Sequence, residues 1–201
     1  MLVLMVGLPG TGKSGLAKFA GKELHAPVLD KDVIKSALVE RGEEDWNRSG
    51  SLAYTILRDL AQHLLQQGFD VVVDSPGHYQ RFQSDMARIA DEEGSEMRLI
   101  ECVCGDDTVR RERFERRKQG DKMSAQHDDL DKVLDEVERD DFLPEGLDAL
   151  KVDTCVDRED AEEKVRAYLA DKPKIADVGT LEPSTIKVEN EEARAAAEGG
   201  G

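Results

Sequence analysis

Eight consecutive residues near the start of the printed sequence have the types and spacing needed to bind phosphate groups. They run from Gly7 to Ser14 and match the pattern G-x-x-x-x-G-K-[ST] at every defined position. Glycines allow the backbone to wrap closely, so that successive amide N–H groups point at phosphate oxygens. We expect Lys13 to reach the β- and γ-phosphates of ATP and the Ser14 hydroxyl to coordinate Mg²⁺. The expected nucleotide-binding residues are Gly7, Leu8, Pro9, Gly10, Thr11, Gly12, Lys13, Ser14 and Gly15.

Two aspartates, Asp30 and Asp32, follow the second apolar segment of the chain. A carboxylate beside a phosphate-binding loop can accept the proton of an attacking hydroxyl group, as the catalytic bases of kinases do. An aspartate at a strand-to-helix junction can also cap the helix. The spacing favours Asp30 as the cap or as a group in the magnesium shell, and Asp32 as the base.

A third aspartate, Asp74, ends the apolar run 71–73. In proteins with such a phosphate loop, an aspartate at this place often contacts the magnesium shell through water. It could instead bind the acceptor of a transferred phosphoryl group, or have a purely structural role, and the sequence leaves these roles open. We expect residues 75–79 to form a loop on the acceptor side.

An arginine-rich stretch follows the fourth apolar segment. Residues 110–122 include seven basic and three acidic side chains. Guanidinium groups bind phosphate oxygens in a bidentate manner and stabilise charge on a transferring group. Arg113 and Arg117 lie one helical turn apart, and we expect them to act from a lid. The alternative is a solvated helix face with ion pairs such as Glu112 with Arg116.

Apolar segments alternate with amphipathic ones along the first 170 residues. The expected strands are 2–6, 27–29, 69–73, 97–103 and 149–152, and the expected helices are 14–24, 32–41, 52–67, 82–93, 107–118, 130–139 and 161–169. This alternation predicts an α/β protein with three α/β/α layers around a parallel five-stranded sheet. With the loop 7–14 after its first strand, such a sheet resembles the P-loop NTPase architecture. Active sites of such sheets lie at the carboxyl ends of the strands, where the loop and the three aspartates would meet.

The charge and the composition indicate the class of partner and the domain limits. The formal net charge of the 201 residues is −16, which disfavours nucleic acid as a partner and leaves small molecules as acceptors. No apolar run approaches the roughly 18 residues of a membrane helix, and the first residues do not resemble a signal peptide, so we expect no membrane contact and a cytoplasmic protein. Residues 1–170 are expected to form one domain and 171–201 a disordered acidic tail.

Three cysteines are present, Cys102, Cys104 and Cys155. A metal site or a redox pair would need partner ligands, and none lie nearby in the sequence. We therefore expect all three to be buried and reduced.

The order of these motifs resembles the P-loop kinases of the zeta-toxin, polynucleotide-kinase and chloramphenicol-phosphotransferase-like group. The resemblance rests on the loop 7–14, the Asp-x-Asp at 30–32, Asp74 and the Arg-x-x-x-Arg at 113–117, and it covers roughly residues 1–170. It implies that Asp32 is the general base, that Lys35 follows it on the acceptor side, and that Asp74 binds the acceptor. Gly15 departs from the Thr or Ser that is usual after the last residue of the loop.

These motifs favour an ATP-dependent kinase that uses Mg²⁺ and a small acceptor with a hydroxyl or nitrogen group. One alternative is a regulatory module that binds a nucleoside triphosphate and hydrolyses it slowly. Another is a polynucleotide 5′-kinase, which would need a basic groove that the net charge of −16 disfavours.

Overall fold

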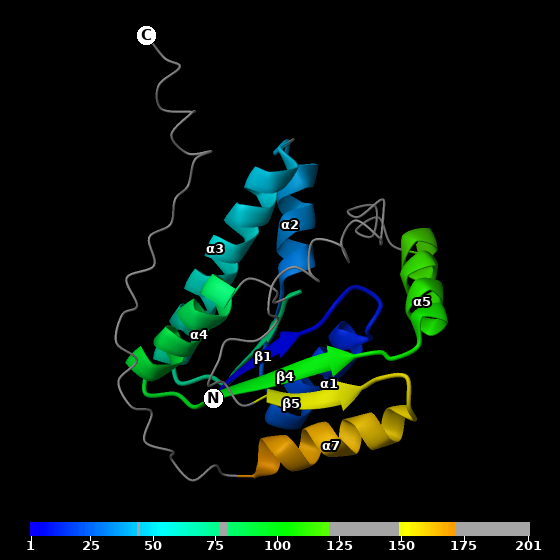
Figure 1. Cartoon of the computed structure of the whole chain (residues 1–201). Helices are drawn as coiled ribbons and strands as arrows, with labels where there is room; N and C mark the ends of the chain where they lie inside the picture. The colour runs from blue at the N-terminus through cyan, green and yellow to red at the C-terminus, as the bar shows by residue number, and fades with distance from the viewer. Residues whose placement is uncertain (44, 77–79, 121–148, 172–201) are drawn as a thin grey trace. The chain divides into compact units, whose positions relative to one another are not determined.

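Five parallel strands form one sheet in the order β2-β3-β1-β4-β5 (Figure 1). The computed structural model describes residues 1–43, 45–76, 80–120 and 149–171, without the side chains of residue 46 and residues 117–120. The strands are β1 (Leu2–Val6), β2 (Val28–Asp30), β3 (Val71–Asp74), β4 (Met97–Val103) and β5 (Ala149–Asp153). The helices are α1 (Lys13–Leu24), α2 (Lys31–Glu40), α3 (Trp46–Gln66), α4 (Gln80–Glu92), α5 (Asp107–Gly120) and α7 (Arg158–Ala170). The expected α/β class with a parallel five-stranded sheet is confirmed.

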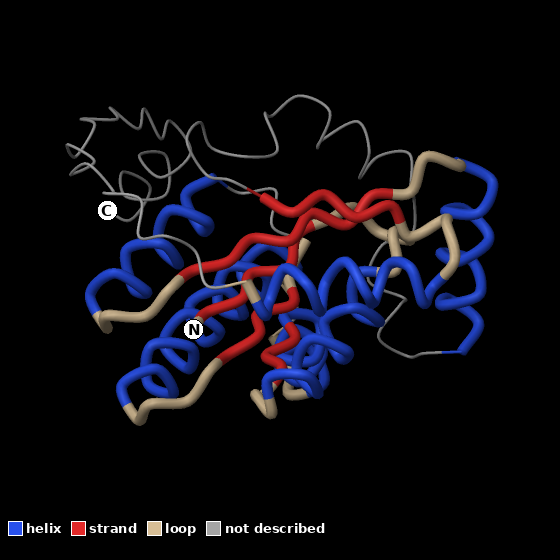
Figure 2. The backbone as a smooth tube through the Cα atoms, turned by 90° about the horizontal axis from the view of Figure 1, so that it is seen from below, coloured by secondary structure: helices blue, strands red, loops and turns tan. Residues whose placement is uncertain are grey.

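Helices cover both faces of the sheet, and Figure 2 shows them on either side of the strands. β1 is the central strand, and each of its five residues is 0% exposed. Its side chains alternate between the faces: Val3 and Met5 join the apolar core beneath α1 and α7, whereas Leu2, Leu4 and Val6 join the core beneath α3 and α4. Burying each such side chain contributes about 1.5–3 kcal/mol, so β1 is held firmly and so is the loop at its carboxyl end.

The strand register brings the predicted carboxylates to one edge of the sheet. Met5 pairs with Asp74, and Asp74 pairs with Asp30. The carboxyl ends of β1, β3 and β2 therefore lie side by side, and the phosphate-binding loop leaves β1 at the same edge. This is the convergence that the order of the motifs predicts.

Two helices begin earlier than their apolar pattern predicts, because aspartates cap them. The Asp45 carboxylate accepts hydrogen bonds of 2.9 Å from the amides of Asn47 and Arg48, so α3 starts at 46 instead of 52. Asp157 accepts from the amide of Glu159 at 2.7 Å, so α7 starts at 158 instead of 161.

Some expectations fall on residues outside the described part of the chain. These are the acidic helix 130–139, residues 77–79 of the acceptor-side loop, and the tail from 172 onward. Within the described residues, no helix has the length and apolar character needed to cross a membrane.

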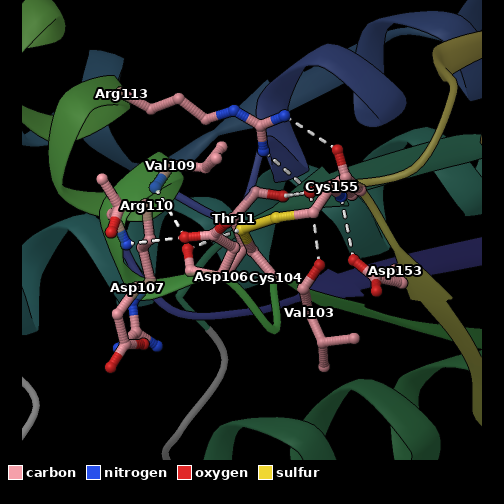
Figure 3. The surroundings of a disulfide bond; sticks show 12 residues. Thr11, Val103, Cys104, Asp106, Asp107, Val109, Arg110, Arg113, Asp153 and Cys155 are labelled. Carbon is pink, nitrogen blue, oxygen red and sulfur yellow. Dashed lines mark hydrogen bonds and ion pairs between the residues drawn. A yellow bond between two sulfur atoms is a disulfide. The ribbon is translucent and has the colours of Figure 1, made fainter.

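The expectation of three reduced cysteines is wrong for two of them. Cys104 and Cys155 form a disulfide with Cα atoms 5.3 Å apart, and Figure 3 shows it between the ends of β4 and β5. The two residues are 51 positions apart in the chain and meet because β4 and β5 are neighbours in the sheet. Cys102 is free and buried, as expected, and burial raises the pKa of its thiol to about 12.

Reduction of the disulfide should lower the free energy of unfolding by about 2–4 kcal/mol, because a cross-link over 51 residues restricts the unfolded chain. Urea denaturation with and without dithiothreitol measures this difference. Cys102→Ser should keep the sensitivity to the reductant, and Cys104→Ser should remove it. Three reactive thiols in the unreduced, denatured protein would contradict the pairing.

Candidate functional site

The loop from Gly7 to Ser14 connects β1 to α1 in a conformation that requires glycine. Gly10 has a φ of 81° and Gly12 a φ of 75°, a backbone region that other residues rarely adopt. A Cβ at Gly10 would lie 2.5 Å from the carbonyl oxygen of Arg110, so α5 also packs directly against the loop. Gly12 is the N-cap of α1, and the positive end of the helix dipole therefore points into the loop.

Hydrogen bonds from two other strand ends hold this loop in place. The amide of Gly7 donates to the carbonyl of Pro76, just after β3, at 3.1 Å. The Thr154 hydroxyl, just after β5, donates to the carbonyl of Thr11 at 2.5 Å. The loop is thus fixed before any ligand binds, which reduces the ordering cost of binding.

An ion pair joins the loop lysine to the third strand. Lys13 Nζ contacts Asp74 Oδ1, and Asp74 is only 2% exposed. The sequence predicts a phosphate contact for Lys13 and a magnesium or acceptor role for Asp74, and the fold brings the two side chains together. Phosphate oxygens can replace Asp74 as the partner of Lys13, because both are anionic acceptors.

The two aspartates after β2 have different surroundings. The Asp30 carboxylate accepts from the amides of Asp32 and Val33 at 2.8 and 3.4 Å, which makes Asp30 the N-cap of α2. Burial raises the pKa of Asp30, and the nearby charges of Asp74 and Asp32 raise it further. Asp32 is 23% exposed and lies in the first turn of α2, at the same edge of the sheet.

These residues fit a magnesium ion that arrives with a nucleotide. Mg²⁺ takes oxygen ligands, usually one or two carboxylates together with phosphate oxygens and water. Ser14 lies in the first turn of α1, and Asp30 and Asp74 are neighbours whose mutual repulsion contributes to the raised pKa of Asp30. Among the described residues, no group of three or more acidic, histidine or cysteine side chains could hold a metal. Ser14, Asp74 and Asp30 would hold the ion together with the phosphates.

The arginine helix α5 lies against the phosphate loop. Arg113 donates to the hydroxyl of Thr154 at 3.0 Å and to its carbonyl at 2.8 Å (Figure 3). A Cβ at Gly12 would lie 3.5 Å from Arg113 Nη1, so this guanidinium lies beside the loop. The side chain of Arg117 lies outside the described residues.

Arg110 also contacts the loop, although the sequence singles out only its neighbours. Its Cγ would be 2.8 Å from a Cβ at Gly10, and its Nε is buried without a hydrogen-bond partner in the described structure. Arg110 precedes Arg113 by three residues and so shares its helix face. The three-residue spacing from Arg113 could have identified Arg110 once this helix was expected to act as a lid.

Comparison with known proteins agrees with this geometry. Residues 2–139 match the AAA_33 family, which is described as an AAA domain. The chain belongs to this family. An L-seryl-tRNA(Sec) kinase of Methanococcus maripaludis is 27% identical over 96 residues, which are 46% of this chain and 36% of that protein. The chain therefore matches little more than a third of the length of this curated relative.

Solved structures share the fold over most of this chain. A proposed kinase of Chloroflexus aurantiacus is 27% identical, with a TM-score of 0.68 over 83% of this chain and 96% of that one. Kti12 of Chaetomium thermophilum, solved with ADP-AlF3, is 16% identical, with a TM-score of 0.65 over 84% of this chain and 97% of that one. The fold of this AAA_33 domain is thus that of small P-loop kinases.

Two lysines of α2 are buried in this AAA_33 domain. Lys35, for which the resemblance implies a place on the acceptor side, is 3% exposed. Lys31 was not expected, because an isolated lysine carries no signal in a sequence, and it is 5% exposed. Burial lowers the pKa of both amines, that of Lys35 to about 7.

Substitution of Asp30 can separate its role as a cap from a role in the magnesium shell. Asparagine keeps an oxygen for the amide of Asp32, so we expect Asp30→Asn to fold with nearly unchanged stability, and Asp30→Ala to lose about 1 kcal/mol. We also expect Asp30→Asn to raise the Mg²⁺ concentration that ATP binding requires. Nucleotide titrations at several Mg²⁺ concentrations test this, and an unchanged requirement would restrict Asp30 to capping.

Lys35 should make the folding stability depend on alkaline pH. Its pKa is about 7 in the folded protein, whereas an unfolded lysine titrates near 10.4. Between these values the unfolded chain binds more protons, so the free energy of unfolding rises with pH, by at most about 1.4 kcal/mol per pH unit for one group. Urea denaturation over this range should show a smaller rise for Lys35→Met. The exposed Lys18→Met should match the wild type, and equal slopes in all three proteins would contradict the assignment.

Proposed function

We propose that the protein transfers the γ-phosphoryl group of ATP to a small-molecule acceptor with the help of Mg²⁺. The observation that supports this most directly is the placement of Asp32. Its carboxylate is partly exposed and lies at the sheet edge that also holds the phosphate loop and the Lys13–Asp74 pair. A phosphate loop alone binds a nucleotide, whereas a carboxylate beside it provides a place for an acceptor.

Asp32 is the general base in this proposal. It accepts the proton of the acceptor hydroxyl as the oxygen of that hydroxyl bonds to the γ-phosphorus. The bond between the γ-phosphorus and the bridging oxygen breaks, and ADP leaves with the electron pair. Lys35 and Asp74 contact the acceptor, which places its hydroxyl in line with the phosphates.

The phosphate side is served by cations and backbone amides. The loop 7–15 holds the phosphates, and Lys13 balances the charge on the β- and γ-oxygens. Arg113 and Arg117 supply guanidinium groups at the transferring phosphoryl, a role supported by the closeness of Arg113 Nη1 to Gly12. Ser14 and Asp30 would hold Mg²⁺ together with the nucleotide, and so would Asp74 where it does not serve the acceptor. The ion would neutralise part of the phosphate charge.

A small acceptor suits the charge of the chain better than a nucleic acid does. The net charge of −16 repels a polyanion, and a polynucleotide kinase would need an extended basic surface. A regulatory domain that binds a nucleotide and hydrolyses it slowly would use the same loop without an acceptor. The two functions differ in whether a transferred phosphoryl group can be found on a second molecule.

We also propose a cytoplasmic location, where ATP is abundant. The thiol pool of a cytoplasm keeps most cysteines reduced. Cys104 and Cys155 would then exchange between the disulfide and two thiols, according to the reduction potential of their surroundings.

Asp32→Asn should reduce phosphoryl transfer by about 10²–10⁴-fold and leave ATP binding nearly unchanged, because it removes the base and spares the loop. Transfer is measured with labelled ATP and a panel of metabolites, and binding is measured by titration with a non-hydrolysable analogue. Glu40→Gln, on the exposed end of α2, should behave as the wild type. Lys13→Met should lose nucleotide affinity.

Equal transfer rates for Asp32→Asn and the wild type would overturn the assignment of the base. Hydrolysis without any acceptor would favour the regulatory domain.

A further inference from the structure

Two lysine amines are buried at the interface between α2 and α3. Lys31 and Lys35 are 5% and 3% exposed and lie four residues apart, so they occupy the same face of α2. Lys31 Nζ is 5.5 Å from the centre of the Tyr54 ring, and a Cβ at Gly50 would lie 3.9 Å from Lys35 Nζ. Both amines therefore face α3. Burying an ammonium group is costly unless an anion accompanies it.

The ammonium group of Lys31 has N–H donors that its ion pair does not use. Within the described residues its one ion-pair partner is Asp32, whose Oδ1 lies 3.6 Å from Nζ, beyond a good hydrogen bond. An ammonium group has three N–H donors. An apolar side chain of similar length would fill the same space without the cost of desolvation. A buried cation with unused donors is therefore better explained by a ligand than by packing.

Ser75 is a second buried polar group, and it follows the strand end that neighbours the one before Lys31. Ser75 is 0% exposed, and its Oγ has no hydrogen-bond partner in the described structure. Ser75 directly follows Asp74, Lys31 directly follows Asp30, and these two aspartates pair in register. Ser75 lies two residues beyond Val73, which packs in the core beneath α3 and α4, so alternation places both on that face of the sheet.

We propose that Lys31, with Lys35 and Ser75, binds an anionic group of the acceptor, so that the acceptor is a small hydroxyl compound with a carboxylate, phosphate or sulfate group. The ammonium groups and the Ser75 hydroxyl donate hydrogen bonds to its oxygens. Because Lys31 adjoins Asp32, an anion held there keeps the rest of a small acceptor within reach of the base. The inference rests on the proposed phosphoryl transfer, which gives the site its acceptor.

One further feature agrees with an anionic acceptor. The net charge of −16 repels anions at long range, and the local cations Lys31 and Lys35 have to offset that repulsion. Burial and the neighbouring Lys31 lower the pKa of Lys35 to about 7, whereas Asp32 acts in the opposite direction. A bound anion would favour the protonated amine and so recover part of that cost.

Binding of matched anionic and neutral compounds tests the proposal. The phosphate loop is first saturated with AMPPNP and Mg²⁺, so that it cannot take up the probe. Calorimetric titrations then compare gluconate with sorbitol, glycerate with glycerol, and glucose 6-phosphate with glucose. We expect at least one anionic member to bind about tenfold or more tightly than its neutral partner. The pair that shows the preference distinguishes carboxylate from phosphate. Absence of any preference in the wild type would overturn the proposal.

Variants of Lys31 test which group is responsible. Lys31→Met fills the same space without charge, and a buried charge replaced in this way usually leaves a folded protein. It should abolish the preference, whereas Lys31→Arg, which keeps the charge, should retain most of it. The exposed Lys22→Met on α1 should equal the wild type. A preference that persists in Lys31→Met, or an equal loss in the Met and Arg variants, would overturn the proposal.

Transfer assays on the same proteins separate this inference from the proposed function. Lys31→Met should raise the KM for an anionic acceptor at least about tenfold and leave the KM for its neutral partner nearly unchanged, and Lys31→Arg should retain most of the affinity for the anionic acceptor. A rise in KM of equal size for the neutral partner would mean that Lys31 acts through Asp32, and would contradict anion binding. If no compound accepts a phosphoryl group while the anion preference still depends on Lys31, the proposed function fails and the anion site stands.

Discussion

The buried ion pair between Lys13 and Asp74 connects the phosphate loop to the carboxyl end of β3. Asp74 is nearly inaccessible to water, so neither charge can lose its partner without a cost of about 3–5 kcal/mol. In the proposed reaction both charges change partners together, because the nucleotide offers phosphates to Lys13 and brings Mg²⁺ to Asp74. In this structure Lys13 and Asp74 neutralise each other. A nucleotide with its metal can take the place of both partners, so that neither charge is left unpaired.

Contacts from several elements keep the loop ready for this exchange. β1 is completely buried, and its carboxyl end fixes where the loop begins. Thr154 links the loop to β5 and accepts both hydrogen bonds of Arg113, so this residue connects α5, the loop and the strand end. The Cys104–Cys155 disulfide ties β4 to β5 at the same place. Preorganised donors of this kind contribute most to charge stabilisation, because they need no rearrangement when the nucleotide arrives.

The sheet separates the two halves of the proposed chemistry. α1 and α5 line the phosphate side, whereas α2 and α3 enclose the buried lysines on the other side. Asp30 and Asp32 lie where the halves meet, and their surroundings differ. One oxygen of Asp30, Oδ1, accepts both hydrogen bonds from the backbone of α2, whereas the side chain of Asp32 is partly exposed.

The sequence by itself determined the loop and the succession of strands and helices along the chain, because both depend on local patterns: glycine and lysine at fixed spacing, and apolar runs that alternate with amphipathic ones. It also placed Asp30, Asp32 and Asp74 at one edge, since parallel strands end on the same side. Only the tertiary structure decided which side chains meet across that edge. The disulfide joins residues 51 apart, Arg110 lies against Gly10, and Lys31 is buried by a helix that follows it in the chain. Each of these depends on which strands and helices become neighbours, and contacts between distant segments leave no periodic signal in a single sequence.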